Sequence, residues 1–337
     1  MKKTLGMMLP CLMLSAVLFS SVDAQEQDSA EVLQHLEAAK KMAGADWASA
    51  ADFFCSTEER IAAMKVLPSA VGRDYEAQYV EPMKVFDNLY FIGQRAVATW
   101  AIATSEGIIL IDAGYAERVE PTLLAGMRAV GLDPARIRYV LVTHGHADHF
   151  GGAKYLQETF GARIGLSAAD WDMIAPAAGA DPPQGPAAAA SPPTRDLVLV
   201  EGQPITLGDT EVTPIAIPAH TPGAMGFVFP VRDGGQTHMA ALFGGTFLNP
   251  AGRIALDRWQ HYLRSIDHFA EVTRGMKVDV ELLNHPLMDD LFVKLARLRT
   301  RTPGEPHPLA VSEATYQRFL GVISACARAQ IARRGGA

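Results

Sequence analysis

The chain has 337 residues, of which 49% are hydrophobic and 20% are charged. This length and composition fit a globular protein with a sizeable core, built as one large domain or two small ones, and exclude a disordered or fibrous chain. The formal net charge is −7. Nucleic acid and anionic lipid carry charge of the same sign, so neither is expected as a main partner.

The first two dozen residues have the pattern of a bacterial secretory signal peptide. Two lysines precede an almost wholly apolar run over residues 5–19, and small or short residues stand just before Gln25. The run is short for a membrane anchor, so we predict cleavage after Ala24. Residues 1–24 are therefore expected to be removed, leaving a periplasmic protein with no membrane association.

Two cysteines, Cys55 and Cys326, remain after the predicted cleavage. In an oxidising compartment they could pair and tie the N-terminal segment to the C-terminal helix. Two separate buried thiols are the alternative, because a sequence does not supply the Cα separation that a disulfide requires. The sequence leaves both possibilities open.

The predicted elements begin with an amphipathic helix over residues 29–42, followed by an irregular segment to about residue 83. In the first half of the remaining chain, strands are expected over residues 85–92, 96–103, 107–111 and 138–142, and helices over 119–130 and 153–160. The Ala- and Pro-rich residues 174–194 are expected to form an exposed loop. In the second half, strands are expected over residues 197–200, 204–207, 211–217, 226–231, 239–243 and 278–283, and helices over 258–274, 289–298 and 312–333.

This order of elements predicts an α/β protein in which two sheets pack together with helices on the outer faces. Residues 25–83 are expected to form an N-terminal helical and irregular extension. Residues 84–300 are expected to form the central domain, and residues 301–337 a C-terminal helix packed on that domain.

Three of the ten histidines lie in one hexapeptide, residues 144–149, directly after a predicted strand. His144 and His146 project to one side of an extended strand end, and Asp148 and His149 fall in the turn that enters the next helix. Four such groups can bracket two metal ions, and imidazole with carboxylate suits Zn²⁺. A polar surface loop is the alternative, but three histidines and an acid in six residues favour metal ligands.

Two further histidines follow predicted strands in the same way. His220 comes after the strand expected over residues 211–217, and His285 after the strand expected over 278–283. Alone, each would be an ordinary buried histidine, but beside the hexapeptide each is predicted to be a ligand. The other histidines are expected to be structural: His35, His238, His261, His268 and His307.

These motifs, in this order, resemble the metallo-β-lactamase superfamily. The resemblance rests on the His-x-His-x-Asp-His motif at residues 144–149, the His-Thr-Pro-Gly turn that begins at His220, and His285. The Leu-Ile-Asp-Ala-Gly segment at residues 110–114 resembles the early strand of that superfamily. The resemblance implies an αββα sandwich of two packed mixed sheets with a dizinc site on one edge, and makes residues 84–300 a hydrolase domain.

The residue at position 246 suggests a place within the superfamily. Glyoxalase II, ribonuclease Z and many phosphodiesterase relatives carry a metal-bridging Asp there, and the first subclass of β-lactamases carries a Cys, whereas this chain has Thr246. The resemblance then implies the third, cysteine-free subclass, in which two Zn²⁺ ions have separate ligands. The implied ligands are His144, His146 and His220 for one ion, and Asp148, His149 and His285 for the other.

The resemblance further implies opening of the β-lactam amide of penicillins, cephalosporins or carbapenems by a zinc-bound hydroxide, an activity that would give antibiotic resistance. Asp148 is the expected catalytic residue, because it can orient the nucleophile and take its proton. Asp112 either holds a ligand imidazole or is simply a turn residue at a strand end. Thr246 and Asn249 are candidates for binding a substrate carboxylate.

Two other functions remain open on the sequence. A dizinc hydrolase with the same site could act on another small molecule, a lactone or an ester, because a fold does not fix a substrate. Asn284 stands before His285, where the lactamase subclass is expected to have proline, and this difference favours such a substrate. A zinc-binding protein with no hydrolytic role is the third possibility.

Overall fold

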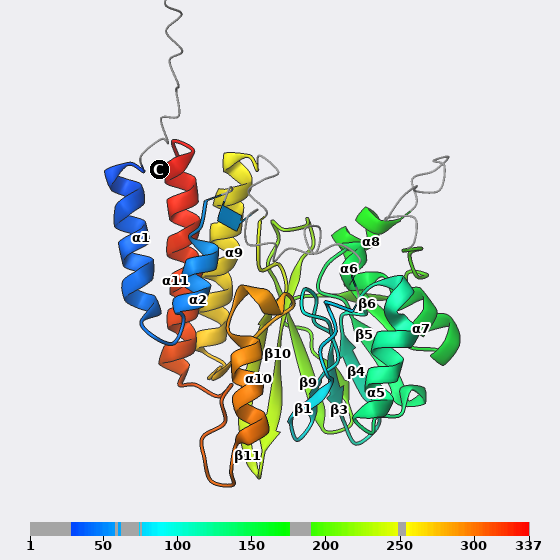
Figure 1. Ribbon diagram of the computed structural model, residues 1–337. Helices are drawn as coiled ribbons and strands as arrows, with labels where there is room; N and C mark the ends of the chain where they lie inside the picture. Colours follow the sequence, from blue (N-terminus) through cyan, green and yellow to red (C-terminus); the bar gives the residue numbers. More distant parts are fainter. Residues whose placement is uncertain are drawn as a thin grey trace, which may run out of the picture.

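The computed structural model describes residues 28–57, 60–61, 74, 76–175, 190–248 and 254–336. The predicted signal peptide, most of the predicted 174–194 loop and Asn249 therefore lie outside the described residues. Two mixed sheets lie face to face with helices on their outer faces (Figure 1). This arrangement confirms the predicted α/β sandwich.

The first sheet has seven strands in sequence order. Its strands up to β4 pair antiparallel, and those from β4 to β7 pair parallel. The strands are β1 (Met83–Phe86), β2 (Leu89–Phe91), β3 (Trp100–Ala103), β4 (Ile108–Ile111), β5 (Ile137–Leu141), β6 (Arg163–Ser167) and β7 (Leu197–Leu199).

Helical crossovers connect the parallel strands of this sheet, as parallel pairing requires. They cover the outer face on the right of Figure 1. The crossovers contain η1 (Ala116–Arg118), η2 (Val119–Leu124), α5 (Ala125–Ala129) and η3 (Pro134–Arg136), then α6 (Ala147–Phe150) and α7 (Ala153–Phe160), then α8 (Ala168–Ile174).

The second sheet has five strands in the order β12-β11-β10-β9-β8. Its strands are β8 (Ile205–Leu207), β9 (Thr210–Ala216), β10 (Met225–Asp233), β11 (Gln236–Phe243) and β12 (Val280–Leu283). Neighbours pair antiparallel except β11 and β12, which are parallel and are connected through α9 (Leu256–Arg274).

The remaining helices form the other outer layer together with α9. They are α1 (Ala30–Ala43), α2 (Ala48–Phe54), η6 (Pro286–Met288), α10 (Leu291–Thr300) and α11 (Glu313–Arg333). Helix α11 packs against α1, α2 and α9 (Figure 1). Residues of these four helices share one hydrophobic core with β11, and where a domain boundary falls stays a prediction. Among the described helices, none is long and apolar enough to cross a membrane.

Alternation along the strands divides the core between the layers. Neighbouring residues of a strand point to opposite faces, so Leu242 lies between the sheets whereas Phe243 lies under the second helical layer. In the same way, Trp100 faces the second sheet and Ala101 faces the helices of the first layer. The Trp100 indole also donates a hydrogen bond of 3.1 Å to the Leu283 carbonyl, which ties the two sheets together.

Several elements differ from those predicted. The segment before residue 83 contains α2, and β6 and α8 were also not predicted from the sequence. These elements are short, so they lack a long hydrophobic period, and buried side chains such as Phe53 and Phe54 stabilise them. The helix expected over residues 119–130 is divided into η2, with Pro121 in its first turn, and α5. The strand expected over 96–103 begins only at Trp100.

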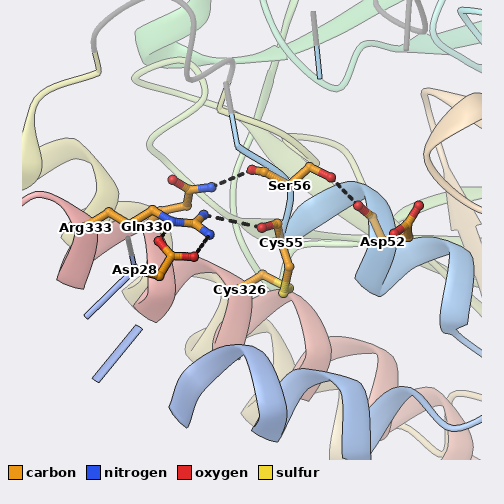
Figure 2. Close-up of a disulfide and its surroundings, with 7 residues drawn as sticks. All are labelled: Asp28, Asp52, Cys55, Ser56, Cys326, Gln330 and Arg333. Carbon is orange, nitrogen blue, oxygen red and sulfur yellow. Dashed lines mark hydrogen bonds and ion pairs between the residues drawn. A yellow bond between two sulfur atoms is a disulfide. The ribbon is translucent and has the colours of Figure 1, made fainter. Parts of the chain in front are cut away.

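Cys55 and Cys326 form a disulfide, which decides between the two possibilities that the sequence left open. Their Cα atoms lie 4.6 Å apart, and the bond joins the end of α2 to α11 across a sequence separation of 271 residues (Figure 2). Two contacts support the same junction. Arg333 forms an ion pair of 2.8 Å with Asp28, and the Gln330 amide donates to the Ser56 carbonyl at 2.9 Å.

Candidate metal centre

The six predicted ligands come from segments that follow strands. Residues 144–149 follow β5 and enter α6, His220 follows β9, and His285 follows β12. The structure brings their side chains together in two groups. In each group the possible ligand atoms lie within 4.8 Å of one another. We refer to His144, His146 and His220 as the first group, and to Asp148, His149 and His285 as the second group.

The first group consists of three closely spaced imidazoles. His146 Nδ1 lies 3.1 Å from His144 Nε2 and 3.0 Å from His220 Nε2. Burial, and then the nearby His149, hold the pKa of His144 well below its usual range. Burial, and then His146, do the same to the pKa of His220. Neutral imidazoles keep a nitrogen lone pair, which is the form that binds a metal.

The second group joins two imidazoles to a carboxylate. His149 Nε2 lies 3.3 Å from His285 Nε2 and 3.4 Å from Asp148 Oδ2. Burial, and then His149, lower the pKa of His285 to about 4. Burial would also lower the pKa of His149, but the carboxylates of Asp148 and Asp112 outweigh it and raise that pKa. Burial would raise the pKa of Asp148, but the imidazoles, His149 first, lower it.

Asp112 contacts the second group through the ring of His149. Its buried carboxylate accepts a hydrogen bond of 2.7 Å from the Thr143 backbone N–H and lies 2.7 Å from His149 Nδ1. A carboxylate accepts hydrogen bonds, so His149 Nδ1 donates to Asp112, and Nε2 is the ring atom directed at Asp148 and His285. Asp112 has a left-handed backbone at φ 63°, which costs roughly 1–2 kcal/mol for a residue other than glycine. Of the two predicted roles, this geometry supports the holding of a ligand imidazole.

Backbone carbonyls fix two other ligand rings in the same way. His220 Nδ1 lies 2.5 Å from the Phe247 carbonyl oxygen, and His285 Nδ1 lies 2.8 Å from that of Ala96. A carbonyl oxygen cannot donate a hydrogen bond, so Nδ1 of each ring carries a proton. Nε2 of each ring then has the lone pair that can bind a metal. The segment that contains Ala96 thus contacts the His285 loop, which explains why β3 begins later than predicted.

The residues present fit divalent metal ions. Each group offers three imidazole or carboxylate ligand atoms that lie close together. Three protein ligands with an open position are typical of catalytic rather than structural metal sites. Asp148 belongs to the second group and keeps 19% of its side chain exposed, so it lies where a substrate or water can reach it.

Thr246 does not face a substrate. It is buried, and its hydroxyl lies 2.6 Å from the Phe243 carbonyl oxygen and 2.9 Å from Asn284 Oδ1. The expected contact with a substrate carboxylate therefore finds no support, because the hydroxyl is used inside the protein. Asn284 in turn donates to the Gly244 carbonyl at 2.5 Å. This bond connects the loops after β11 and β12, a function that proline could not serve.

Two supporting residues were not predicted from the sequence. Asp170 on α8 is fully buried and accepts hydrogen bonds from both loops of the first group. The Ser167-x-x-Asp170 spacing is a helix-capping pattern that could have drawn attention to it. On α9, Arg258 donates to the carbonyls of Ala219, at 2.7 Å, and His220.

Tyr262, one turn along the same face of α9, donates to the Thr246 carbonyl. The spacing of Arg258 and Tyr262 on one helical face was visible in the sequence. It carried no signal for the site, because both side chains bind backbone atoms.

Comparison with known proteins agrees with this geometry. The model of the metallo-beta-lactamase superfamily matches residues 92–234. A curated hydroxyacylglutathione hydrolase of Acidiphilium cryptum is 34% identical over 129 residues, which are 38% of this chain and 46% of the relative. A probable metallo-hydrolase of Burkholderia pseudomallei is 32% identical over 132 residues, or 38% and 43% of the two chains. The matches thus span less than half the length of these curated relatives.

Solved structures match over a larger share. A metallo-beta-lactamase of Cronobacter sakazakii with a HARLDQ motif has a TM-score of 0.64 and 26% identity, covering 77% of this chain and 98% of the other. The metallo-beta-lactamase MIM-1 of Novosphingobium pentaromativorans has a TM-score of 0.62 and 27% identity, with coverages of 78% and 94%. BJP-1, a subclass B3 metallo-beta-lactamase of Bradyrhizobium japonicum, has a TM-score of 0.58 and 25% identity, with coverages of 74% and 93%.

Residues 92–234 thus match a domain of the metallo-beta-lactamase superfamily, and the fold supports a metal-dependent hydrolase. Its structural neighbours include the cysteine-free subclass that the sequence analysis had named.

Proposed function

We propose that the mature chain is a periplasmic, zinc-dependent β-lactamase that opens the amide of a small-molecule β-lactam. One observation carries the proposal. Among the described residues, the candidate ligands form two separate groups of three, and Thr246, at the position of a bridging Asp in other relatives, directs its hydroxyl into the protein. The fold around these groups matches more than nine-tenths of the length of solved β-lactamases such as MIM-1 and BJP-1.

The proposed cofactor is two Zn²⁺ ions, one held by each group. Imidazole nitrogens and one carboxylate suit zinc better than magnesium or calcium, which prefer oxygen ligands. Bound there, the ions would supply Lewis acidity and would lower the pKa of a water molecule toward neutral.

The chain's own residues have separate tasks in this reaction. The Asp148 carboxylate is ionised at neutral pH, since neighbouring imidazoles lower its pKa. It can therefore orient the attacking water and accept its proton. Asp112, Ala96 and Phe247 hold three of the ligand rings by Nδ1. They keep the site preorganised while charge develops on the substrate carbonyl.

Two features support a periplasmic location. The first is the signal-peptide pattern of residues 1–24. The second is the bond between Cys55 and Cys326, because structural disulfides form and persist mainly in oxidising compartments. Cleavage after Ala24 is tested by mass spectrometry of the protein purified from a periplasmic extract. Retention of residues 1–24 would contradict it.

Hydrolysis of a non-lactam acyl substrate, such as a lactone, an ester or a thioester, is the second candidate. The observation in its favour is that curated relatives named hydroxyacylglutathione hydrolase are 32–34% identical to this chain in their matched segments. Those segments cover at most 42% of this chain in the relatives of that name. They therefore support the shared metal motif more than a shared substrate.

The test compares substrates on the zinc-loaded mature chain. We expect hydrolysis of a chromogenic cephalosporin and a carbapenem, lost on addition of a chelator and in His144→Ala. His268→Ala is the matched control, because that histidine is partly exposed and pairs with Glu201. Two bound zinc ions without β-lactam turnover would contradict the proposal, and activity on S-acyl glutathione or a lactone would then establish the second candidate. No turnover of any of these substrates would favour a zinc-binding protein without hydrolytic function.

A further inference from the structure

We propose that Asp170 is the positioning residue of the first group, and that it sets the metal affinity of His144, His146 and His220 without contacting a metal itself. The inference rests on the metal binding of the proposed function but not on its substrate. It concerns a residue that lies in none of the motifs identified in the sequence.

The carboxylate of Asp170 joins the two loops that carry the first group. Its Oδ2 accepts a hydrogen bond of 2.7 Å from the Gly145 N–H and one of 2.6 Å from the Thr221 hydroxyl. Its Oδ1 accepts a bond of 2.8 Å from the Gly223 N–H. Gly145 stands between His144 and His146, and Thr221 follows His220. A single side chain therefore fixes the backbone beside all three ligands.

Close packing makes α8 and the two loops one unit. A Cβ on Gly145 would lie 2.8 Å from Ile174 Cγ2, and a Cβ on Gly223 would lie 1.9 Å from Ser167 Oγ. Both positions thus need glycine for the approach to α8. Asp170 is itself fixed, because its backbone N–H donates to Ser167 Oγ at 3.1 Å in the N-terminal cap of the helix.

The charge of Asp170, like its hydrogen bonds, favours metal binding by the first group. The side chain is fully buried, where bonds to an ionised acceptor are about twice as strong as neutral ones. A buried anion beside the first group favours a bound cation. Loss of such supporting partners typically lowers metal affinity by about 10- to 100-fold.

Asp112 offers a contrast within the same centre, since it bonds directly to His149 of the second group. The contacts of Asp170 go to Gly145, Thr221 and Gly223, which all adjoin the first group. Removing the Asp170 charge is therefore expected to weaken one metal site and to spare the other.

The test is Asp170→Asn, which keeps the size of the side chain but directs an amide N–H at groups that are themselves donors. The apo protein is titrated with Zn²⁺ against a chromophoric chelator. Signals of ¹⁵N-labelled histidine rings show which site fills. We expect the affinity of the first group to fall by about 10- to 100-fold. That of the second group should change by less than about twofold.

Two further variants separate positioning from general stability. Asp279→Asn is the matched control. Asp279 accepts from the Met239 N–H at 2.8 Å and lies 2.6 Å from His238 Nδ1, so it is an aspartate with similar bonds outside the two ligand groups. It should leave both affinities unchanged. Thr221→Val removes only the hydroxyl donor, keeps the fold testable if Asp170→Asn does not fold, and should weaken the first group by about fivefold.

Each outcome decides the inference. Provided that the unsubstituted chain binds two zinc ions, two results for Asp170→Asn would overturn the inference. One is an equal loss of zinc affinity at both groups, and the other is no loss of affinity at the first group. The same holds for an unchanged first group in Thr221→Val. If the unsubstituted chain binds no zinc at all, the proposed function fails together with the inference.

Discussion

The first group is held by helices from both outer layers, whereas the second group lies deeper and is held at its ligand rings. Asp170 on α8 and Arg258 on α9 bind the loops of the first group from opposite sides. In the second group, the Asp112 carboxylate and the Ala96 carbonyl bind the rings of His149 and His285 directly. The first group should therefore respond to changes in the helical layers, and the second to changes within the centre.

The largest expected effect on stability comes from removing the disulfide that joins α2 to α11. Reduction, or Cys55→Ser, should lower the free energy of unfolding by about 4 kcal/mol, since a long loop is released in the unfolded chain. Because Phe53 of α2 packs 5.0 Å from Phe247, whose carbonyl binds His220, the metal affinity of the first group should fall more than that of the second. Denaturant unfolding and zinc titration with and without reductant measure both. Reductant should have no further effect on Cys55→Ser.

The next effect tests the deeper group. His149→Ala leaves the buried Asp112 carboxylate without its imidazole partner, and removing one partner of such a buried pair costs about 3 kcal/mol or more. The apo protein should lose this amount in urea unfolding. The second site should not fill on zinc titration. An apo stability equal to that of the unsubstituted chain would contradict the argument that Asp112 depends on His149.

A smaller effect is expected at the α9 side of the first group. Arg258→Ala removes two donors from the carbonyls of Ala219 and His220, and we expect about a tenfold weaker first site. Arg264→Ala, at an exposed position on the same helix, is the matched control. Arg258→Lys should restore part of the affinity, because one donor can still reach a carbonyl. A loss at the second group instead would mean that α9 supports the whole centre.

The smallest effect is expected from Tyr262→Phe. The Tyr262 hydroxyl donates to the Thr246 carbonyl inside the protein, and leaving a buried acceptor unpaired costs about 1 kcal/mol. Thermal unfolding should show this loss in the apo and the zinc-loaded chain alike. A change in metal affinity without a change in stability would assign Tyr262 to the site rather than to the fold.

The candidate ligands could be recognised in the sequence because metal binding demands particular side chains. His144, His146, Asp148 and His149 stand in six residues after an apolar strand, and few structural reasons would gather them there. Asp112 was recognised with two possible roles, and only its contact with His149 separates them. The disulfide remained open for a similar reason, since its formation depends on a distance in space.

Residues that bind backbone atoms could not be predicted in this way. Every residue offers a backbone carbonyl, and every residue except proline offers a backbone N–H. Arg258 binds carbonyls and Asp170 binds mainly N–H groups, so neither needs a partner type that a sequence would show. For Asp170 the helix also contributed, because α8 is too short for a clear hydrophobic period. Thr246 is the opposite case. Its position suggested the site, but its side chain turns into the protein.

The bond between Cys55 and Cys326 has one more consequence, for the integrity of the molecule after damage. The two cysteines are 271 positions apart in the sequence, so the bond closes a covalent ring that contains almost the whole described sandwich. A single cut in any loop of that ring leaves both pieces attached, so a nicked molecule keeps its two ligand groups in one particle.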